Sequence, residues 1–338
     1  MSSDQAFVTL ATNDRYAIGA LVLAASLKKV NTSKKLAILI TKELSESMRL
    51  IKILAQFFDV IQEVDLLQSN NEKLLQALRR PELGVTLTKI HCWKLCQFSK
   101  CVFMDADTLV IKNIDELFDY EELSAVPDVG WPDCFNSGVF VFTPSTNTFD
   151  NLVDLANREG SFDGGDQGLL NTYFSDWATS DIKRHLSFIY NMTLTSTYSY
   201  LPAFKRFGAN VKVIHFLGSM KPWNCSYDSS AKKLNTFVCN ENAQNFIEQW
   251  WQVLMESVHP IIQNVISYLS NHGFSTFKFS CSQMNLTGSM SCLMISGSNV
   301  QFDQNRYQEW QKGDIDYLGA DSFENIQKRL DASIHGQN

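Results

Sequence analysis

The sequence predicts an α/β fold with a mainly parallel mixed sheet flanked by helices. At the start of the chain, short apolar runs alternate with longer amphipathic segments in the order strand, helix, strand, helix, strand. Connections of this kind between parallel strands are right-handed and pass over one face of the sheet. The 338 residues are 45% hydrophobic, which is enough apolar material for a substantial core.

The first elements follow from hydrophobic periodicity. Strands are expected where apolar residues form short runs, and helices where apolar residues recur every three or four positions. Thr12-Asn13-Asp14 supplies N-cap chemistry just before the first helix. The expected order is a strand at Ala6–Ala11, a helix at Tyr16–Lys29, a strand at Leu36–Ile40, a helix at Met48–Phe58 and a strand at Val60–Val64.

The middle and later parts of the chain continue this alternation. A long apolar stripe predicts a helix at Phe246–Leu269, which Pro260 is expected to kink. The elements expected before it are a helix at Thr86–Phe98, a strand from Val102, a strand at Ser137–Phe142, a short helix at Thr148–Ala156, a helix entered at Leu169 and a strand at Val211–Phe216.

Composition divides the chain into three regions. Residues 1–270 are expected to form the folded domain. Residues 271–304 are rich in Ser and Asn, poor in charge and without periodicity, which is typical of a flexible linker. In residues 305–338 the periodic apolar positions return, and Asp321 with Glu324 resembles a capping box. The sequence therefore predicts a short helical tail after the linker.

Charge and hydropathy exclude several classes of partner. The net charge of −7 provides no basic field for nucleic acid or an anionic membrane. No apolar stretch approaches the ~18 residues that a membrane span needs. No basic segment followed by an apolar one is visible at the N-terminus, so we expect a cytoplasmic protein. The eight cysteines show no metal-ligand spacing and are expected to be reduced thiols.

Two aspartates follow the apolar run that starts at Val102, and they are the first candidate site. Ligands of α/β proteins bind beyond the carboxyl ends of the strands, where Asp105 and Asp107 are expected to lie. If the backbone is extended there, residues two apart point the same way at a Cα spacing of roughly 7 Å, and both carboxylates can reach one cation. The alternative is a loop with two solvated acids.

His215 is the candidate third ligand, because it ends another predicted strand. The alternative is a hydrogen-bonded core histidine. Two carboxylates and one imidazole suit a divalent ion that also holds phosphate oxygens, and the mixed donor set favours Mn²⁺ over Mg²⁺ or Ca²⁺. Lys89 and Lys221 could assist as point charges, or could be ordinary surface lysines.

A glycine-rich acidic loop, Asp163–Gln167, is the second candidate site. Its glycines allow the backbone to approach a ligand, and its carboxylates can bind sugar hydroxyls. The alternative is a polar turn in which Asp166 is the N-cap of the next helix. Farther along, Tyr198 lies on a polar segment, where an exposed tyrosine is either a nucleophile or simply a surface residue.

Taken together, these motifs resemble the glycogenin family, which are self-glucosylating retaining glycosyltransferases of family 8 with the GT-A nucleotide-sugar-binding fold. The resemblance runs from Asp4 to about Trp223, and the C-terminal segment around Trp310 is also similar to the family's tail. Its most specific segments are Phe7–Leu10, Arg80–Lys89, Asp105–Val110, Asp133–Val139, Gly164–Gly168, Tyr198–Phe204 and His215–Gly218.

The resemblance implies UDP-glucose as the donor and Mn²⁺, with Mg²⁺ as the alternative, held by Asp105, Asp107 and His215. It also implies catalytic roles for Asp163, Asp166 and Lys89, and Tyr198 as the acceptor of the first glucose. The positions that match the donor site are Leu10, Thr12, Asn13, Tyr16, Arg80, Lys89, Asp105, Ala106, Asp107, Asn136, Ser137, Asp163, Asp166, Gln167, His215, Gly218 and Lys221.

The family's assembly is part of the same expectation. The resemblance implies a homodimer, transfer within or across subunits, and elongation of an α-1,4-glucan primer. It implies further that residues 305–338 bind glycogen synthase.

Two alternative functions remain at this point. Asp105–Val110 also fits the Asp-x-Asp-x-Thr-Leu pattern of haloacid-dehalogenase-type phosphatases, although that motif usually opens the chain and here three predicted strands precede it. The other alternative is an adaptor that recruits glycogen synthase through the amphipathic tail, whose apolar face suits binding in a groove.

Overall fold

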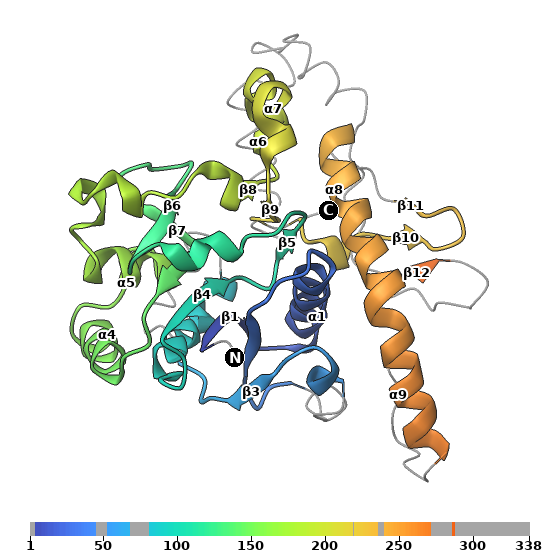
Figure 1. Cartoon of the computed structure of the whole chain (residues 1–338), viewed down its shortest axis with the longest axis horizontal. Helices are drawn as coiled ribbons and strands as arrows, with labels where there is room; N and C mark the ends of the chain where they lie inside the picture. Colours follow the sequence, from blue (N-terminus) through green and yellow to red (C-terminus); the bar gives the residue numbers. More distant parts are fainter. Residues whose placement is uncertain are drawn as a thin grey trace, which may run out of the picture. The chain divides into compact units, whose positions relative to one another are not determined.

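A six-stranded sheet with the strand order β3-β2-β1-β4-β7-β6 forms the centre of the protein (Figure 1). The computed structural model describes residues 4–44, 53–67, 81–218, 220–235, 240–271 and 286–287. The mutually parallel neighbours are β1 (Gln5–Ala11), β2 (Lys35–Ile40), β3 (Val60–Glu63) and β4 (Lys100–Met104). Strand β7 (Phe135–Phe142) runs in the reverse direction and pairs antiparallel with both β4 and β6 (Ser124–Pro127). The predicted α/β fold with a mainly parallel mixed sheet is confirmed.

The sheet is buried on both faces, and alternate residues of its strands enter two separate apolar cores. In β4, Val102 belongs to one core and Phe103 to the other. In β7, Val141 and Phe140 divide in the same way. This alternation follows from the two-residue period of an extended chain. It explains why β7 is fully buried along its length and has almost no polar side chain after Ser137.

Helix α1 (Asp14–Lys29) covers one face of the sheet. Asn13 is its N-cap, and the Asn13 side chain accepts hydrogen bonds from the backbone N–H groups of Arg15 and Tyr16. Residues 17–27 of the helix are buried, because α1 packs against β1 and also against the second sheet and the C-terminal helices. The prediction for this helix and its cap is confirmed.

The opposite face is covered by η2 (Pro81–Lys94), α4 (Thr146–Arg158) and α5 (Asp166–Tyr173). The segment predicted as an α-helix over Thr86–Phe98 is wound as a tighter 3₁₀-helix and ends at Lys94. Within the predicted helix Met48–Phe58, the described part contains only a 3₁₀ turn, η1 (Leu54–Gln56), and residues 45–52 lie outside the described residues.

A smaller three-stranded sheet, β5-β9-β8, adjoins the end of β4. Its strands are β5 (Thr108–Val110), β9 (Val213–His215) and β8 (Met192–Thr193). Strand β9 confirms the late strand that was predicted to end near His215. Beyond β8 the chain forms two short helices, α6 (Ser196–Ser199) and α7 (Leu201–Phe207), which project from this end of the molecule (Figure 1).

The predicted C-terminal helix is two α-helices joined by a π turn. Helix α8 (Glu241–Val253) leads into the π segment η9 (Leu254–Val258) and then into α9 (His259–Asn271). Pro260 is the second residue of α9, just after the π segment. Proline has no N–H group, and its ring displaces the preceding turn of the helix. The π segment is therefore the structural form of the predicted kink.

The remaining elements are short. They are η3 (Asp115–Asp119), η4 (Trp177–Thr179), η5 (Ile182–Arg184), η6 (Phe188–Tyr190), η7 (Gly208–Asn210), η8 (Pro222–Asn224), β10 (Tyr227–Asp228), β11 (Lys233–Leu234) and β12 (Leu286–Thr287). Strand β12 pairs with β10 from within the predicted linker. The predicted tail, residues 305–338, lies outside the described residues.

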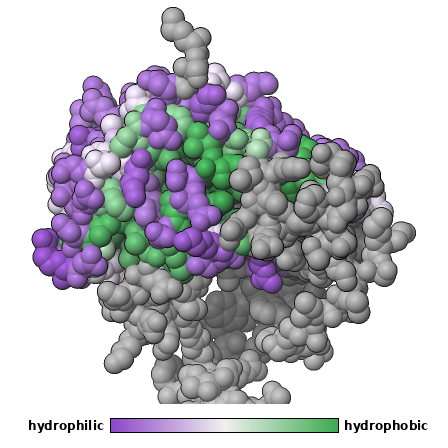
Figure 2. Space-filling model, turned by 90° about the horizontal axis from the view of Figure 1, so that it is seen from below, coloured by the Kyte–Doolittle hydropathy of each residue, from purple (hydrophilic) through white to green (hydrophobic). Residues whose placement is uncertain are grey.

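On the face shown in Figure 2, hydrophilic side chains border areas of apolar residues. Among the described helices, none combines the length and the apolar character that a membrane crossing requires. The described cysteines, Cys92, Cys96, Cys101, Cys134 and Cys225, are free thiols.

Gly19 in α1 allows a close approach that supports the site. A Cβ atom at this position would lie 2.6 Å from the carbonyl oxygen of Ala106 and 2.7 Å from the Trp223 ring. We expect Gly19→Ala to destabilise the protein by roughly 1–3 kcal/mol, because neither neighbour is free to move. Helix propensity alone predicts the opposite sign, a gain of about 1 kcal/mol. Urea unfolding of the two proteins decides between these outcomes, and a stabilised variant would contradict the packing argument.

Candidate active site

A cavity of about 460 Å³ opens at the carboxyl ends of the parallel strands. Its lining combines residues from the central sheet, the second sheet, η2 and α5. The predicted site residues that line it are Leu10, Thr12, Asn13, Tyr16, Lys89, Asp105, Ala106, Asp107, Asn136, Ser137, Asp163, Asp166, Gln167, His215, Gly218 and Lys221. Arg80 lies outside the described residues, and Tyr198 is not part of the lining.

Asp105 and Asp107 lie on a turn between β4 and β5. The backbone N–H and the hydroxyl of Thr108 both donate to the carbonyl oxygen of Asp105, at 3.1 and 2.7 Å. The expectation that extended backbone aligns the two aspartates is therefore wrong. The chain turns here because Thr108 must leave the first sheet and enter the second, and the turn itself brings the two carboxylates together.

His215 completes a cluster with the two aspartates. One ligand atom from each of the three residues lies within 4.8 Å of the other two. His215 is 1% exposed, and its Nε2 atom lies 3.5 Å from Asp107 Oδ1 without forming a hydrogen bond to any described residue. A buried nitrogen without a partner, facing two carboxylates, fits a divalent cation and argues against the alternatives of solvated acids and a satisfied core histidine.

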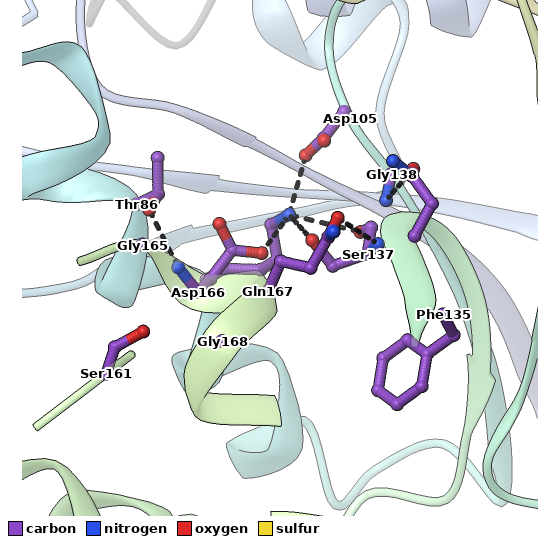
Figure 3. A network of polar contacts seen from close by, with 12 residues as sticks. Thr86, Asp105, Phe135, Ser137, Gly138, Ser161, Gly165, Asp166, Gln167 and Gly168 are labelled. Atoms are coloured by element: carbon purple, nitrogen blue, oxygen red, sulfur yellow. Dashed lines mark hydrogen bonds and ion pairs between the residues drawn. The ribbon is translucent and has the colours of Figure 1, made fainter. Parts of the chain in front are cut away.

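Lys89 is the buried cation of the site. It comes from η2, is 3% exposed, and its Nζ lies 3.0 Å from Asp105 Oδ1 and 2.5 Å from Asp166 Oδ2. It also donates to the carbonyl oxygen of Ser137 at 3.1 Å. Figure 3 shows Asp105, Asp166 and Ser137 converging on this point from three different elements. Lys89 is thus an internal ion-pair partner, and the alternative of a surface lysine is excluded.

The pKa values of these groups reflect their burial and mutual contacts. Burial alone would lower the pKa of Lys89, but Asp105 and Asp166 outweigh it and hold the pKa above its usual value. Burial raises the pKa of Asp105, and the nearby Asp107 adds to this while Lys89 opposes it. The pKa of Asp107 shifts the other way: burial raises it, but Lys221 and His215 more than compensate. Asp107 is therefore the more firmly ionised of the two candidate carboxylate ligands.

Lys221 is the second cation of the site. Its Nζ contacts Asp107 Oδ2 and donates to the carbonyl oxygen of Phe216 at 2.8 Å. The segment that carries it follows β9 and includes Gly218, whose φ of +95° lies in a region that other residues rarely adopt. Lys221 and Lys89 thus line the same cavity, and each forms an ion pair with a different aspartate of the pair.

The acidic loop is organised by Asp163. Its Oδ1 accepts hydrogen bonds from the Ser161 hydroxyl and from the N–H groups of Gly165 and Gly168, at 2.8, 2.9 and 3.0 Å. The suggestion that Asp166 caps the following helix is wrong, because Asp166 is the first residue inside α5 and Gly165 is the N-cap. Since Asp163 satisfies those donors, the Asp166 carboxylate is available to Lys89 at the cavity wall.

The strand β1 end of the cavity is apolar and aromatic. The Tyr16 ring packs edge-on against Trp223, with 5.1 Å between ring centroids. Leu10 and Thr12 complete this end, while the Asn13 side chain is engaged in capping α1. An aromatic and aliphatic wall beside a cluster of carboxylates and lysines suits a ligand with a flat ring at one end and charged groups at the other.

Tyr198 lies on α6 and is 44% exposed. The neighbouring Tyr200 is 68% exposed. Helix α6 follows β8, which pairs with the strand that carries His215, so the segment is attached to the site although its phenol does not line the cavity.

Some residues of the site were not predicted from the sequence. Among them, Thr86, Asp128 and Gly138 line the cavity, and Asn191 forms a hydrogen bond with His215. Gly138 is the tightest of these positions, since a Cβ atom there would lie 2.4 Å from His215 Cε1. Their proximity depends on contacts between distant parts of the chain, and only the Gly after Asn136-Ser137 offered a local signal.

Comparison with known proteins was consistent with this geometry. The family model of glycosyl transferase family 8 matches residues 7–226. Glycogenin-1 of Homo sapiens is 50% identical over 98% of this chain and 99% of its own length, and glycogenin-1 of Oryctolagus cuniculus is 51% identical over the same shares. Glycogenin-2 of Homo sapiens is 53% identical over 78% of this chain and 53% of its own length.

Solved structures show the same fold at low sequence identity. The glycosyltransferase GlyE of Streptococcus pneumoniae TIGR4 matches with a TM-score of 0.53 and 20% identity, over 79% of this chain and 64% of that one. The galactosyltransferase LgtC, solved in complex with donor and acceptor sugar analogues, matches with a TM-score of 0.50 and 18% identity, over 73% of this chain and 94% of that one. These likenesses support the predicted GT-A architecture.

The Lys89 ion pairs should dominate the stability of the site. We expect Lys89→Met to destabilise the protein by about 3–5 kcal/mol at neutral pH, because it leaves Asp105 and Asp166 without their cation. Without Lys89 the pKa of Asp105 is free to rise further above its unfolded value. The folded variant then binds more protons than its unfolded chain. The destabilisation by Lys89→Met should therefore shrink as the pH falls from about 7 to about 5.

Urea unfolding at the two pH values measures this effect. Lys100→Met is the matched control, since Lys100 donates to the carbonyl oxygens of Phe118 and Tyr120 and its removal strands no carboxylate. The loss of unfolding free energy in Lys100→Met should be smaller than in Lys89→Met and independent of pH in this range. Equal losses for the two lysine variants at both pH values would contradict the ion-pair account.

Proposed function

The chain belongs to glycosyltransferase family 8 and, within it, to the glycogenins, and on this basis we propose that it is a self-glucosylating enzyme. It transfers glucose from UDP-glucose, with retention of the α configuration, to its own Tyr198 and then extends an α-1,4-glucan primer. The family match offers no support for the phosphatase alternative, and the Asp-x-Asp turn follows the fourth strand of the chain instead of opening it.

The observation that carries the proposal is the cluster of Asp105, Asp107 and His215 beside the cavity. Two carboxylates and an imidazole fit a divalent cation, and the mixed oxygen and nitrogen donors favour Mn²⁺ over Mg²⁺. When bound, such a cation stabilises the negative charge of a departing diphosphate. Ala106 lies between the two ligands and lines the same cavity, at the junction of the cation cluster and the proposed nucleotide end.

The donor is proposed to lie across the cavity from β1 to α5. Leu10, Thr12, Asn13 and Tyr16 form the uridine end, and Arg80 is assigned to the diphosphate and sugar by its match to the family. Lys221 and Gly218 are assigned to the diphosphate. Lys221 contacts Asp107, and Gly218 has a positive φ. Asn136, Ser137 and Gln167 form the sugar end, where Gln167 accepts from the Ser137 N–H at 3.2 Å.

Asp166 is the carboxylate assigned to the anomeric carbon. Lys89 fixes its position, and the Thr86 hydroxyl accepts a hydrogen bond from its backbone N–H at 3.1 Å. An ionised carboxylate at this position stabilises the positive charge that the sugar acquires as the leaving group departs. Asp163 contributes by fixing the loop, and Lys89 by forming ion pairs with both the half-buried Asp105 and the buried Asp166.

The acceptor and the partners complete the proposal. Because Tyr198 lies on α6 outside the cavity lining, transfer requires the α6 segment to move or a second subunit to present its tyrosine. We therefore include the homodimer expected of the family. We also assign the glucan as the later acceptor, residues 305–338 as the segment that binds glycogen synthase, and the cytoplasm as the location.

The acceptor is tested by intact-mass spectrometry after incubation with UDP-glucose and Mn²⁺. The wild-type protein should gain successive hexose increments, and Tyr198→Phe should gain none, because the phenol that forms the first bond is missing. Tyr200→Phe is the matched control, since Tyr200 is a neighbouring exposed tyrosine. Peptide mapping should place the first hexose on Tyr198. Increments that persist in Tyr198→Phe but vanish in Tyr200→Phe would overturn the assignment.

The adaptor role is tested separately by removing the tail. Truncation after Ser298 should abolish the capture of glycogen synthase in a pull-down and leave self-glucosylation intact, because the site described above lies entirely within residues 4–221. Loss of both activities would contradict the division into a catalytic domain and a binding tail. The wild-type chain and a Tyr198→Phe chain, which keeps the tail, serve as controls for capture.

A further inference from the structure

Within the described part of the chain, the His215 side chain forms one hydrogen bond, and its partner is Asn191. The Nδ1 atom of His215 lies 2.9 Å from Asn191 Oδ1. Both residues are 1% exposed. They are also fixed relative to each other by the backbone, because Asn191 directly precedes β8, which pairs with β9 so that Thr193 lies opposite His215.

The direction of this hydrogen bond follows from its neighbours. Asn191 donates through Nδ2 to Asn136 Oδ1 at 2.8 Å, so its oxygen is the atom that faces His215. Asn136 is oriented in turn, because its Nδ2 donates to Asp128 Oδ2 at 2.9 Å and its Oδ1 also accepts from the Gly138 N–H at 3.0 Å. An ionised carboxylate can only accept, so Asp128 fixes the polarity of the whole chain.

The direction of these hydrogen bonds determines the tautomer of the His215 imidazole. An oxygen at Nδ1 requires a proton on Nδ1, and a neutral imidazole then has its lone pair on Nε2. This Nε2 atom is the buried nitrogen that faces Asp107 and has no hydrogen-bond partner among the described residues. Asn191 thereby determines which nitrogen of His215 can bind a metal.

We propose that Asn191 is a positioning residue for the divalent cation: it holds His215 as the Nδ1–H tautomer and aims the Nε2 lone pair at the cluster of Asp105 and Asp107. The proposal rests on the proposed function, because it assumes that this cluster binds the cation. Partners of this kind behind a histidine ligand typically contribute 10- to 100-fold in metal affinity, and the same range, about 10- to 100-fold, is expected here.

Two substitutions separate orientation from packing. Asn191→Leu keeps the number and branching of the side-chain heavy atoms but neither donates nor accepts, so it releases the imidazole. Asn191→Asp keeps an acceptor for Nδ1–H but loses the donor to Asn136 Oδ1. If Asn191 orients His215, Asn191→Asp should bind the cation much more tightly than Asn191→Leu. If Asn191 only fills space, Asn191→Leu should be the less affected of the two.

The measurement is Mn²⁺ binding to the full chain without UDP-glucose, followed by the electron paramagnetic resonance signal of free Mn²⁺. We expect the dissociation constant of Asn191→Leu to rise about 10- to 100-fold. Asn113→Leu is the matched control. It removes an asparagine that donates to Val30 and Asn31 and accepts from Asp115, away from the cavity, and should leave Mn²⁺ binding unchanged.

A second readout is made on the wild-type protein and needs no substitution of Asn191. In the wild-type protein labelled with ¹⁵N-histidine, the nitrogen shifts of His215, assigned with His215→Gln, should report the Nδ1–H tautomer. The Nε2–H tautomer would overturn the proposal. So would equal Mn²⁺ affinity in the wild type and Asn191→Leu, and in that case the proposed function would stand. A wild-type protein that binds no Mn²⁺ would instead overturn the metal site itself, and this inference with it.

Discussion

The buried ammonium group of Lys89 is the interaction on which the site depends. It lies between Asp105, at the end of β4, and Asp166, at the start of α5. Two carboxylates cannot remain ionised in a buried site without a neighbouring cation, because desolvation and mutual repulsion both favour protonation. Lys89 removes this difficulty and at the same time ties η2 to β7 through the carbonyl oxygen of Ser137. The side chain of Lys89 therefore links η2 to the end of β4, to β7 and to α5.

The site also depends on a line of hydrogen bonds that begins at Asp128 and ends at His215. Asp128, Asn136, Asn191 and His215 are joined so that each donor has one acceptor. Gly138 lies beside this line, and only a residue without a side chain leaves room for the imidazole there. The tautomer of His215 is thus determined by Asn191, which does not line the cavity, and through it by Asn136 and Asp128, which do. The positive charges of Lys89 and Lys221 act on the acids independently of it.

The sequence was sufficient for the parts of the site that local patterns encode. Apolar runs located the strands, and Asp105, Asp107 and His215 were recognised because each lies at the end of such a run. The backbone between the aspartates was not predictable in this way, because the turn arises from the passage of the chain into a second sheet. No local sequence pattern indicated the roles of Asn191 and Asp128 either. Their roles come from contacts with residues 24 and 8 positions away, which the sequence alone does not pair.

The register of the small second sheet explains why these distant residues meet. Thr108 pairs with His215 across β5 and β9, and the N–H of Phe216 donates to the carbonyl oxygen of Asp107 at 2.9 Å. A shift of one residue would turn the imidazole to the other face of the sheet. Its place would then be taken by Ile214 or Phe216, neither of which can bind a cation. Because both of those side chains are fully buried in the core, such a shift would also expose apolar surface to the cavity. Core packing therefore enforces the register, and the register in turn assembles the cluster of ligands.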